Sequence, residues 1–530
     1  MREEWKEEKR QAERETVLHD VCPESILCEA SGEYTLPDYR PEIRKILFVR
    51  AVAMPAGQYK NGDKAAFAGA VSHTVFYADS EGKPAAVTLE ADYEFSLPLP
   101  EGCTCTLQVD SRAENTACRL FGPRKLSLRT AVRSTVHLLC EEEITPAVRG
   151  MGSEEDEASL ERLSARVETM EQACGSSGPF TLEADLHLDG PATGAEAVWA
   201  GGSLLVSECR PQAGGCLCRG HAWVRCLLRE EEGLPYAVRE KIPFEQLVPI
   251  AEAGERASCL AYGRLLAAEV ELLPGEGEEN GNLHVTVSAE IDACAVSGKI
   301  CNPTSDLYST DYVMACTYRP LTGTRSLGGV MGNYTVSGSR AREECDCEAA
   351  VTVVDADGRM EIHGVQVERG RAVVSGKLAV TVIMAAAEGS QPFPTAELSI
   401  PFRIETELRP APGTQPRFDC HGELISVRAR LEQSAVSADC EIALVLSATE
   451  ERTVEILATA EPDRSLPVTH SGRGVHVVSP REEATLFSVG ARYHKSRAAI
   501  AAQNGLGEEI LSVSHLPESL DGVHHLLIED

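Results

Sequence analysis

Three stretches of this chain alternate apolar and polar residues with a strict period of two. In the clearest, Leu283, Val285, Val287, Ala289 and Ile291 share one face, and polar residues from His284 to Asp292 occupy the other. The same pattern runs over Leu126 to Leu138 and, less cleanly, over Val436 to Leu446. Successive side chains of a strand point to opposite faces, so each stretch is predicted to be an antiparallel strand with one buried face.

A second pattern precedes each of these strands. Segments that start at Gly69, Gly220 and Gly376 each hold an alternating strand, a turn with glycine, and a further strand that closes on Phe95, Phe244 or Phe402. Hairpin signals come before them at Asn61-Gly62, Gly214-Gly215 and Arg369-Gly370. Asn61-Gly62 is the strongest, because a type I′ turn needs positive φ at both central residues. Each copy is therefore predicted to contain a meander of locally paired strands.

These repeats predict a mainly β protein. We expect three tandem antiparallel modules, each a sandwich or a barrel, followed by a small βααβ domain. The predicted divisions are a charged helical lead (1–16), module 1 (17–150), a helical or flexible linker (151–178), module 2 (179–310), module 3 (311–460), a polar linker (461–474) and the C-terminal domain (475–530).

The C-terminal stretch carries a different periodicity. An apolar strand at Val475 to Val478 is followed by two short amphipathic helical patterns, the second ending at Asn504-Gly505. A late strand, Leu526 to Ile528, is expected to pair with the first. This pattern predicts a small domain with the order strand, helix, helix, strand.

Composition narrows the classes of partner. The 530 residues include 50 Lys and Arg against 82 Asp and Glu, which gives a net charge of −32. Such a charge repels phosphate backbones, so nucleic-acid binding is not expected. No apolar run is long enough for a transmembrane segment, and the charged start lacks the apolar core of a signal peptide. We therefore expect the chain to stay in the compartment where it is made.

The 19 cysteines are expected to be free thiols in a reducing cytosol. Three pairs are spaced C-x-C, at Cys103/Cys105, Cys216/Cys218 and Cys345/Cys347. Residues two apart on a strand share a face, so these pairs are interpreted as small core residues. Because C-x2-C knuckles are absent, no metal site is expected.

Motifs of catalysis are also missing from the sequence. It contains no P-loop, no G-x-S-x-G elbow, no H-E-x-x-H and no G-x-G-x-x-G. We therefore predict a protein that is not an enzyme, with no catalytic residues and no cofactor.

The segment EYTLPDYRPEIRKILFV, from Glu33 to Val49, carries a family resemblance. Leu36, Pro37, Asp38, Pro41, Glu42 and Ile43 match the L-P-D-x-x-P-[DE]-I entry motif of SPOCS domains, the modules of spore-coat morphogenesis proteins. The two prolines bar a continuous helix, so the motif is read as an extended structural staple rather than a contact surface. Modules 2 and 3 lack this motif and are assigned from their strand pattern.

The C-terminal stretch is similar to a LysM domain, and SPOCS repeats before a LysM domain resemble the SipL-like coat proteins of clostridial spore formers. The resemblance implies a scaffold in the mother-cell cytoplasm at the forespore surface, docked by this domain to the morphogenetic ATPase of the coat basement layer (SpoIVA-like) and to other coat proteins. Self-association is a further expectation.

Phe487, Tyr493, Ile500 and Asn504 are the candidate partner-binding residues. LysM domains usually open with G-D-T-L-W, which is replaced here by Glu483 to Phe487. This favours a protein ligand over a sugar, and leaves a glycan-binding protein of the spore cortex or cell wall as the alternative.

Overall fold

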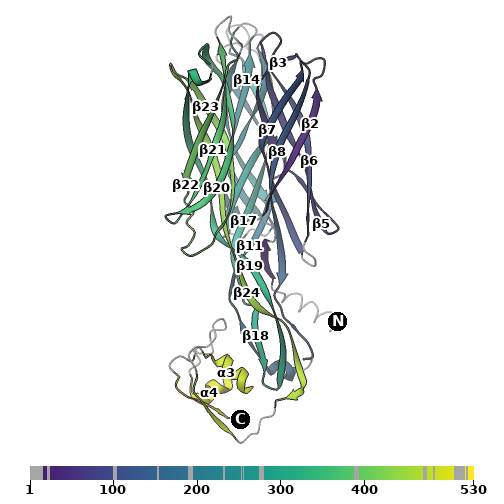
Figure 1. The fold of residues 1–530 in the computed structure, drawn as a ribbon, viewed down its shortest axis with the longest axis vertical. Coiled ribbons are helices and arrows are strands. Elements are labelled where there is room, and N and C mark those ends of the chain that lie inside the picture. Colours follow the sequence, from purple (N-terminus) through teal and green to yellow (C-terminus); the bar gives the residue numbers. More distant parts are fainter. Residues whose placement is uncertain are drawn as a thin grey trace.

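A computed structural model describes residues 16–529, except 21–23, 100–103, 152–153, 189–194, 231–232, 252–253, 255, 274–279, 346, 387–392, 469–473, 481–483, 507–519 and 521–522. The described chain is mainly antiparallel β (Figure 1). The predicted helical lead lies outside these residues except for Thr16, which begins the first strand. No helix among the described residues is long and apolar enough to cross a membrane.

Module 1 consists of two antiparallel sheets. In the first sheet, β8 is the central strand, with β7 on one side and β1 and β2 in succession on the other. In the second sheet, β5 is the central strand, with β6 on one side and β3 and β4 in succession on the other. The strands are β1 (Thr16–Asp20), β2 (Glu24–Thr35), β3 (Ile43–Ala53), β4 (Gly57–Asn61), β5 (Lys64–Asp79), β6 (Pro84–Pro98), β7 (Thr104–Gly122) and β8 (Lys125–Glu143).

Module 2 repeats this plan. In its first sheet, β17 is the central strand, with β11 and β12 in succession on one side and β16 on the other. The second sheet has the order β13–β14–β15. The strands are β11 (Val167–Ser176), β12 (Phe180–His187), β13 (Glu196–Gln212), β14 (Gly215–Arg229), β15 (Tyr236–Pro249), β16 (Ser258–Leu273) and β17 (Asn282–Cys301).

Module 3 follows the same order, with one long first strand in place of two short ones. Its sheets are β19–β24–β23 and β20–β21–β22. A bulge at Ser326 to Gly328, where Gly328 has φ +113°, marks the place at which modules 1 and 2 interrupt that strand. The strands are β19 (Tyr312–Ala341), β20 (Ala350–Glu368), β21 (Arg371–Ala386), β22 (Thr395–Glu405), β23 (Arg417–Leu431) and β24 (Ala435–Pro467), with a 3-10 turn η1 (Arg342–Cys345).

Each pair of sheets packs face to face, so every module is a sandwich. The core of module 2 joins Val224 of β14 to Val285 of β17, and that of module 3 joins Val380 of β21 to Leu444 of β24. The apolar residues predicted to face inward do so: Leu283, Val285, Val287, Ala289 and Ile291 are all fully buried. The period-two pattern therefore predicted both the strands and their buried face.

Two predicted linkers are wrong in part. Residues 151–178 were expected to be helical or flexible, but the helix α2 covers only Glu154–Ala158, and β10 (Leu160–Ser164) and β11 follow. β11 pairs with β17, so it belongs to module 2. The segment 461–474 was expected to be a linker, yet β24 continues to Pro467. In both places pairing with a distant strand overrides the local polarity of the sequence.

The three hairpin turns fall at the predicted places, but their types differ from the prediction. Asn61 pairs with Lys64, so Gly62 and Asp63 form the loop, and only Gly62 has positive φ. Arg369 and Gly370 both have positive φ, at 50° and 78°. The type I′ geometry therefore belongs to the third module rather than the first.

The three sandwiches stand side by side and form the broad end of the molecule, above a narrow stalk (Figure 1). An apolar cluster shared by all three includes Leu47 and Phe76 of module 1, Leu227 of module 2, and Ile383 of module 3. The stalk is built from the ends of β19 and β24, β10 paired with β18 (Thr304–Ser309), and β9 (Ala147–Val148) parallel to β24.

The C-terminal unit is a βααβ arrangement at the end of the stalk (Figure 1). Strands β25 (Val475–Val478) and β26 (Leu526–Glu529) pair antiparallel, as predicted, with α3 (Leu486–Tyr493) and α4 (Arg497–Asn504) between them in the chain.

Candidate functional site

The C-terminal unit has its own small core. Leu486 and Val489 of α3, Ile500 of α4, and Leu526 and Ile528 of β26 pack together. Thr485 caps α3 in a reciprocal capping box with Ser488, and Ser496 caps α4. Two short helices are marginal alone, so this core and these caps stabilise the unit.

The unit packs against the stalk through its first helix and the loop after it. The rings of Phe487 and Tyr308 meet edge to face with centroids 5.0 Å apart. The Tyr308 hydroxyl donates to the carbonyl of Lys495 at 2.9 Å, and His494 Nδ1 lies 2.8 Å from the carbonyl of Ser309.

An ion pair completes this contact. Arg497 Nε at the start of α4 lies 2.8 Å from the Glu161 carboxylate of β10. Both side chains are largely buried, at 22% and 18% exposure, so this pair is screened less than a surface pair. The contact fixes the unit against the stalk.

Two of the predicted partner-binding residues do not offer a surface to a partner. Ile500 is 1% exposed in the core of the unit, and Phe487 is 4% exposed against Tyr308. Both were assigned to partner binding, but in the folded chain Ile500 belongs to the core of the unit and Phe487 to the stalk contact. The sequence could not separate these uses because Tyr308 lies far away in the chain.

The other two candidates have different roles. The Asn504 side-chain amide donates to the carbonyls of Ile500 and Leu527, and its oxygen accepts from the Leu527 N–H at 2.6 Å. Asn504 therefore ties α4 to β26 as an added strand would. Tyr493 is partly exposed, with its ring 5.5 Å from that of His476.

An apolar surface lies on the outer face of the two C-terminal strands, which the sequence analysis missed. Val475, Val477 and Leu527 are 60%, 66% and 46% exposed, and Val477 pairs directly with Leu527. We call these three residues the outer strip. The sequence carried a signal for this strip, because β25 and β26 have apolar residues on both of their faces. Only one face of each strand can cover the core, so apolar residues on the other face are left exposed.

Two side chains of α4 bond to the outer edge of β26. The side-chain oxygen of Asn504 accepts from the Leu527 N–H, and that of Gln503 accepts from the Glu529 N–H. Within the described part of the chain, β25 pairs with β26 alone.

The modules meet along a charged junction. Arg50 of module 1 binds both carboxylate oxygens of Asp357 of module 3, at 3.1 and 2.9 Å, and donates to the Gly202 carbonyl of module 2 at 2.6 Å. Arg225 of module 2 lies 2.6 Å from the same carboxylate and also contacts Asp355. This first junction cluster therefore ties all three sandwiches together.

The charges of that cluster are stabilised by one another. Burial opposes ionisation of Asp357, but the neighbouring Arg225 and Arg50 guanidinium groups lower its pKa to about 2. Asp355, only 3% exposed, has its pKa raised by burial despite Arg225 and Arg239. Removal of one partner would leave a buried charge uncompensated.

A second junction cluster also takes residues from every module. Asp110 of module 1 pairs with its neighbour Arg112 at 2.8 Å and with His421 of module 3 at 3.0 Å. The His421 ring stacks on Tyr262 of module 2, with centroids 4.2 Å apart. Burial opposes the charge of Asp110, but Arg112, His421 and Arg264 hold its pKa well below the usual range.

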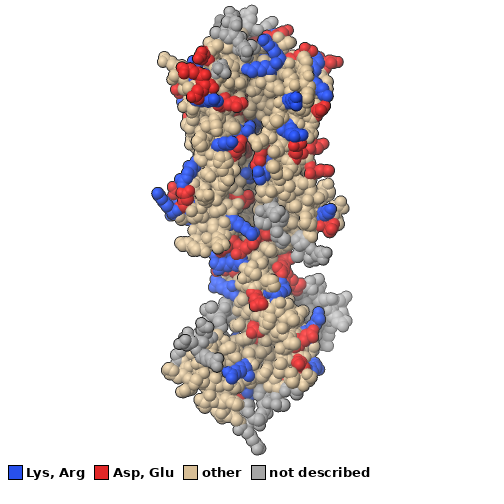
Figure 2. Space-filling view, in the orientation of Figure 1, with Lys and Arg blue, Asp and Glu red and all other residues tan. Residues whose placement is uncertain are grey.

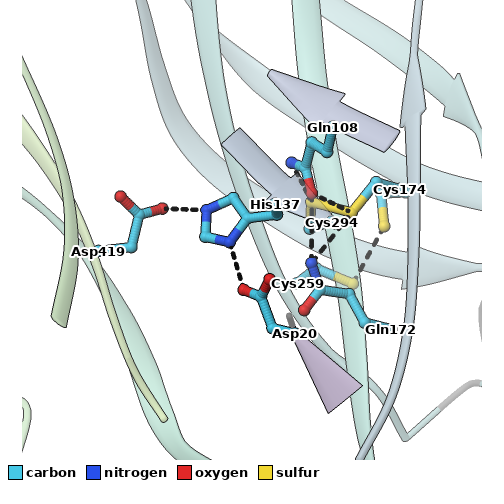
Figure 3. Close-up of a disulfide and its surroundings, with 9 residues drawn as sticks. Asp20, Gln108, His137, Gln172, Cys174, Cys259, Cys294 and Asp419 are labelled. Carbon is cyan, nitrogen blue, oxygen red and sulfur yellow. Dashed lines mark hydrogen bonds and ion pairs between the residues drawn. A yellow bond between two sulfur atoms is a disulfide. The ribbon is translucent and has the colours of Figure 1, made fainter. Parts of the chain in front are cut away.

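A third group centres on His137, which lies between two carboxylates (Figure 3). Its Nδ1 is 2.6 Å from Asp20, and its Nε2 is 3.6 Å from Asp419 of module 3. Burial disfavours the charged ring, but hydrogen bonds to Asp20 and Asp419 raise its pKa to about 10. The imidazolium is therefore charged at neutral pH and links modules 1 and 3.

Disulfides also differ from the prediction of free thiols. Cys174 is bonded to Cys294 beside Gln108 and Gln172 (Figure 3), and Cys105 is bonded to Cys140. Both pairs lie directly opposite each other in their ladders. Strand register brings these sulfur atoms together, and the linear sequence does not reveal it. Cys216 and Cys218 do share a buried face, as predicted.

Cavities of about 180 and 160 Å³ lie at the junction. The first is lined by Arg50, Arg112, Arg264 and Glu423, and burial raises the pKa of Glu423 to about 7 against the opposing effect of these arginines. Arg50, Arg112 and Arg264 already pair with carboxylates of the junction. The arrangement therefore holds the modules together.

The entry motif is a staple of module 1, as the prediction of a structural role required. Arg124, in the turn between β7 and β8, donates to the carbonyls of Pro37, Asp38 and Arg40. The N–H groups of Leu36 and Ile43 bond to the same turn, and both side chains are buried. The motif thus joins the two sheets where the chain crosses between them.

Charge is mixed on the face of the molecule that Figure 2 shows. Figure 2 shows acidic and basic side chains interspersed on the visible face of the sandwiches and the stalk.

Comparisons with models of known protein families and with curated proteins gave no match.

Proposed function

We propose that this chain is a non-enzymatic assembly scaffold of the bacterial spore coat. Its three sandwiches would form a rigid body, and its C-terminal unit would dock that body to the morphogenetic ATPase of the coat basement layer. The observation that carries the proposal is the outer strip on β25 and β26, at the far end of the stalk from the sandwiches.

The junction supports a structural rather than a catalytic use of the body. Arg50, Asp357 and Arg225 come from three different modules and satisfy one another. Such networks fix the relative placement of packed units, and a body of fixed shape suits a spacer between coat layers.

The C-terminal unit supports the docking role. Exposed apolar residues that gather on a small sheet are typical of protein contacts. The fixed contact with the stalk through Phe487 and Arg497 would transmit this attachment to the whole body. The Leu36 to Ile43 motif supports placement among SPOCS-domain coat proteins.

Co-purification of the full chain with the basement-layer ATPase tests the proposal. The double variant Val477→Lys/Leu527→Lys places charge on the outer strip and should reduce recovery of the ATPase at least tenfold, with an unchanged circular dichroism spectrum. The control Leu247→Lys replaces an exposed leucine of module 2, 41% exposed, and should leave recovery unchanged.

Two results would count against the proposal. Equal recovery by the wild type and the double variant would remove the outer strip as the docking surface. Retention on peptidoglycan, with competition by chitin oligomers, would instead favour the glycan-binding alternative.

A further inference from the structure

Four cysteines converge at one end of module 2. Cys209 on β13 and Cys218 on β14 are direct partners in the ladder, with sulfur atoms 3.6 Å apart. Cys216 on β14 lies 3.0 Å from the sulfur of Cys259, which belongs to β16 in the opposite sheet. The sulfur atoms of Cys209, Cys216 and Cys259 all lie within 4.8 Å of one another. We call these four residues the thiol cluster.

We propose that the thiol cluster binds a thiophilic d10 metal ion, Zn²⁺, which links the two sheets of module 2. Tetrahedral zinc with bonds of about 2.3 Å to sulfur places its sulfur ligands about 3.8 Å apart. The two sulfur–sulfur distances of 3.0 and 3.6 Å lie below that value, and the 4.8 Å limit within which the sulfur atoms of Cys209, Cys216 and Cys259 lie is above it. Binding would require the sulfur atoms of Cys216 and Cys259 to move apart by about 0.8 Å.

The ligand set agrees with this ion. Three thiols lose their protons to solvent as three Zn–S bonds form, and no oxidant or reductant is needed. Cys218 is the candidate for a fourth ligand because it adjoins Cys209 and shares a face with Cys216. Soft sulfur ligands favour zinc over magnesium or calcium, which prefer oxygen.

The equivalent positions of modules 1 and 3 show which residues the sandwich holds where module 2 has cysteines. Counted from the equivalent hairpin turns, Cys216 corresponds to Ala65 and Ala372, and Cys218 to Phe67 and Val374. All six side chains are fully buried or nearly so. The sandwich therefore packs without sulfur at these positions, and packing alone does not account for the cysteines of module 2.

The sequence lacks C-x2-C knuckles, and this absence predicted no metal site. That criterion applies to ligands on tight turns. Here β register and sheet packing bring together Cys209, Cys216 and Cys259 from three strands. The close pair Cys216 and Cys259 could also form a disulfide, and this outcome is separated by the test.

The test uses the full chain, purified under reducing conditions and reconstituted with Zn²⁺ alone. One tightly held zinc per chain is expected by elemental analysis after dialysis, with a rise in the thermal midpoint. Co²⁺ in its place should give the strong thiolate charge-transfer absorption of a sulfur site.

The variant Cys216→Ala/Cys218→Val installs the residues that module 3 uses and should retain less than a tenth of the zinc while keeping its circular dichroism spectrum. The matched control Cys226→Ala lies on the same strand in the same core, outside the cluster, and should keep the full equivalent. Failure of the reduced wild type to hold zinc would overturn the proposal. So would retention of zinc by the double variant, or a Cys216–Cys259 disulfide that persists under reducing conditions.

Discussion

Two contacts hold the parts of this chain together, and their chemistry differs. Besides one shared apolar cluster, the sandwiches meet through buried charges, with Asp357 placed between Arg50 and Arg225 from two other modules. The C-terminal unit meets the stalk through an aromatic pair, Phe487 and Tyr308, with one ion pair beside it. The first contact depends on mutual neutralisation of charges that burial destabilises, and the second mainly on apolar area. They should therefore respond differently to mutation and to pH.

The largest expected effect comes from loss of the shared carboxylate. Asp357→Ala leaves Arg50 without its carboxylate and Arg225 with Asp355 alone, which should lower the free energy of unfolding by about 3–5 kcal/mol. Urea denaturation of the full chain measures this change. The control Asp439→Ala removes an exposed pair with Arg430 and should cost no more than about 1 kcal/mol. Similar losses in the two variants would show that the junction charges are not specially important.

Loss of a side chain from the contact between the C-terminal unit and the stalk should have a smaller and more local effect. Phe487→Ala removes a buried ring and its aromatic partner contact, and should destabilise the docked C-terminal unit by about 2–4 kcal/mol. Hydrogen exchange is expected to increase in α3 and β18 but not in the sandwiches. Equal increases in module cores such as β17 would mean that the two contacts unfold as one.

The charged histidine gives the junction a dependence on pH. The pKa of His137 rises from its ordinary value of about 6.5 in the unfolded chain to about 10 in the folded chain. Its stabilising contribution is therefore complete below about pH 6.5 and is lost as pH rises toward 10. Urea midpoints at pH 7 and pH 10 should differ less for His137→Gln than for the wild type. An unchanged pH dependence in the variant would contradict the ion pairs with Asp20 and Asp419.

The smallest expected change concerns one hydroxyl. Tyr308→Phe keeps the ring against Phe487 but loses the hydrogen bond to the Lys495 carbonyl, at a cost of about 0.5–1.5 kcal/mol. The same exchange measurement on α3 should show a smaller increase than Phe487→Ala produces. A larger increase than that of Phe487→Ala would place the main strength of the contact in the hydrogen bond.

Prediction from sequence succeeded where the signal was local. Alternation over Leu283 to Ile291 predicted the strand and its buried face, and the apolar runs at Val475 to Val478 and Leu526 to Ile528 predicted the pairing of β25 with β26. It failed over 151–178, where β11 is specified by pairing with β17 more than by its own polar residues. It also misassigned Phe487, whose partner Tyr308 belongs to the stalk.

The sequence by itself determined the repeated strands, the side of each strand that is buried, and the order of modules before a βααβ unit. These follow from a period of two or of about 3.6 residues, which is set within a single element. Only the tertiary structure decided that the modules pack together, that Arg50 and Asp357 neutralise each other across them, and that Cys259 meets Cys216. Such contacts join residues far apart in the chain, and their partners are fixed by register and packing rather than by any local pattern.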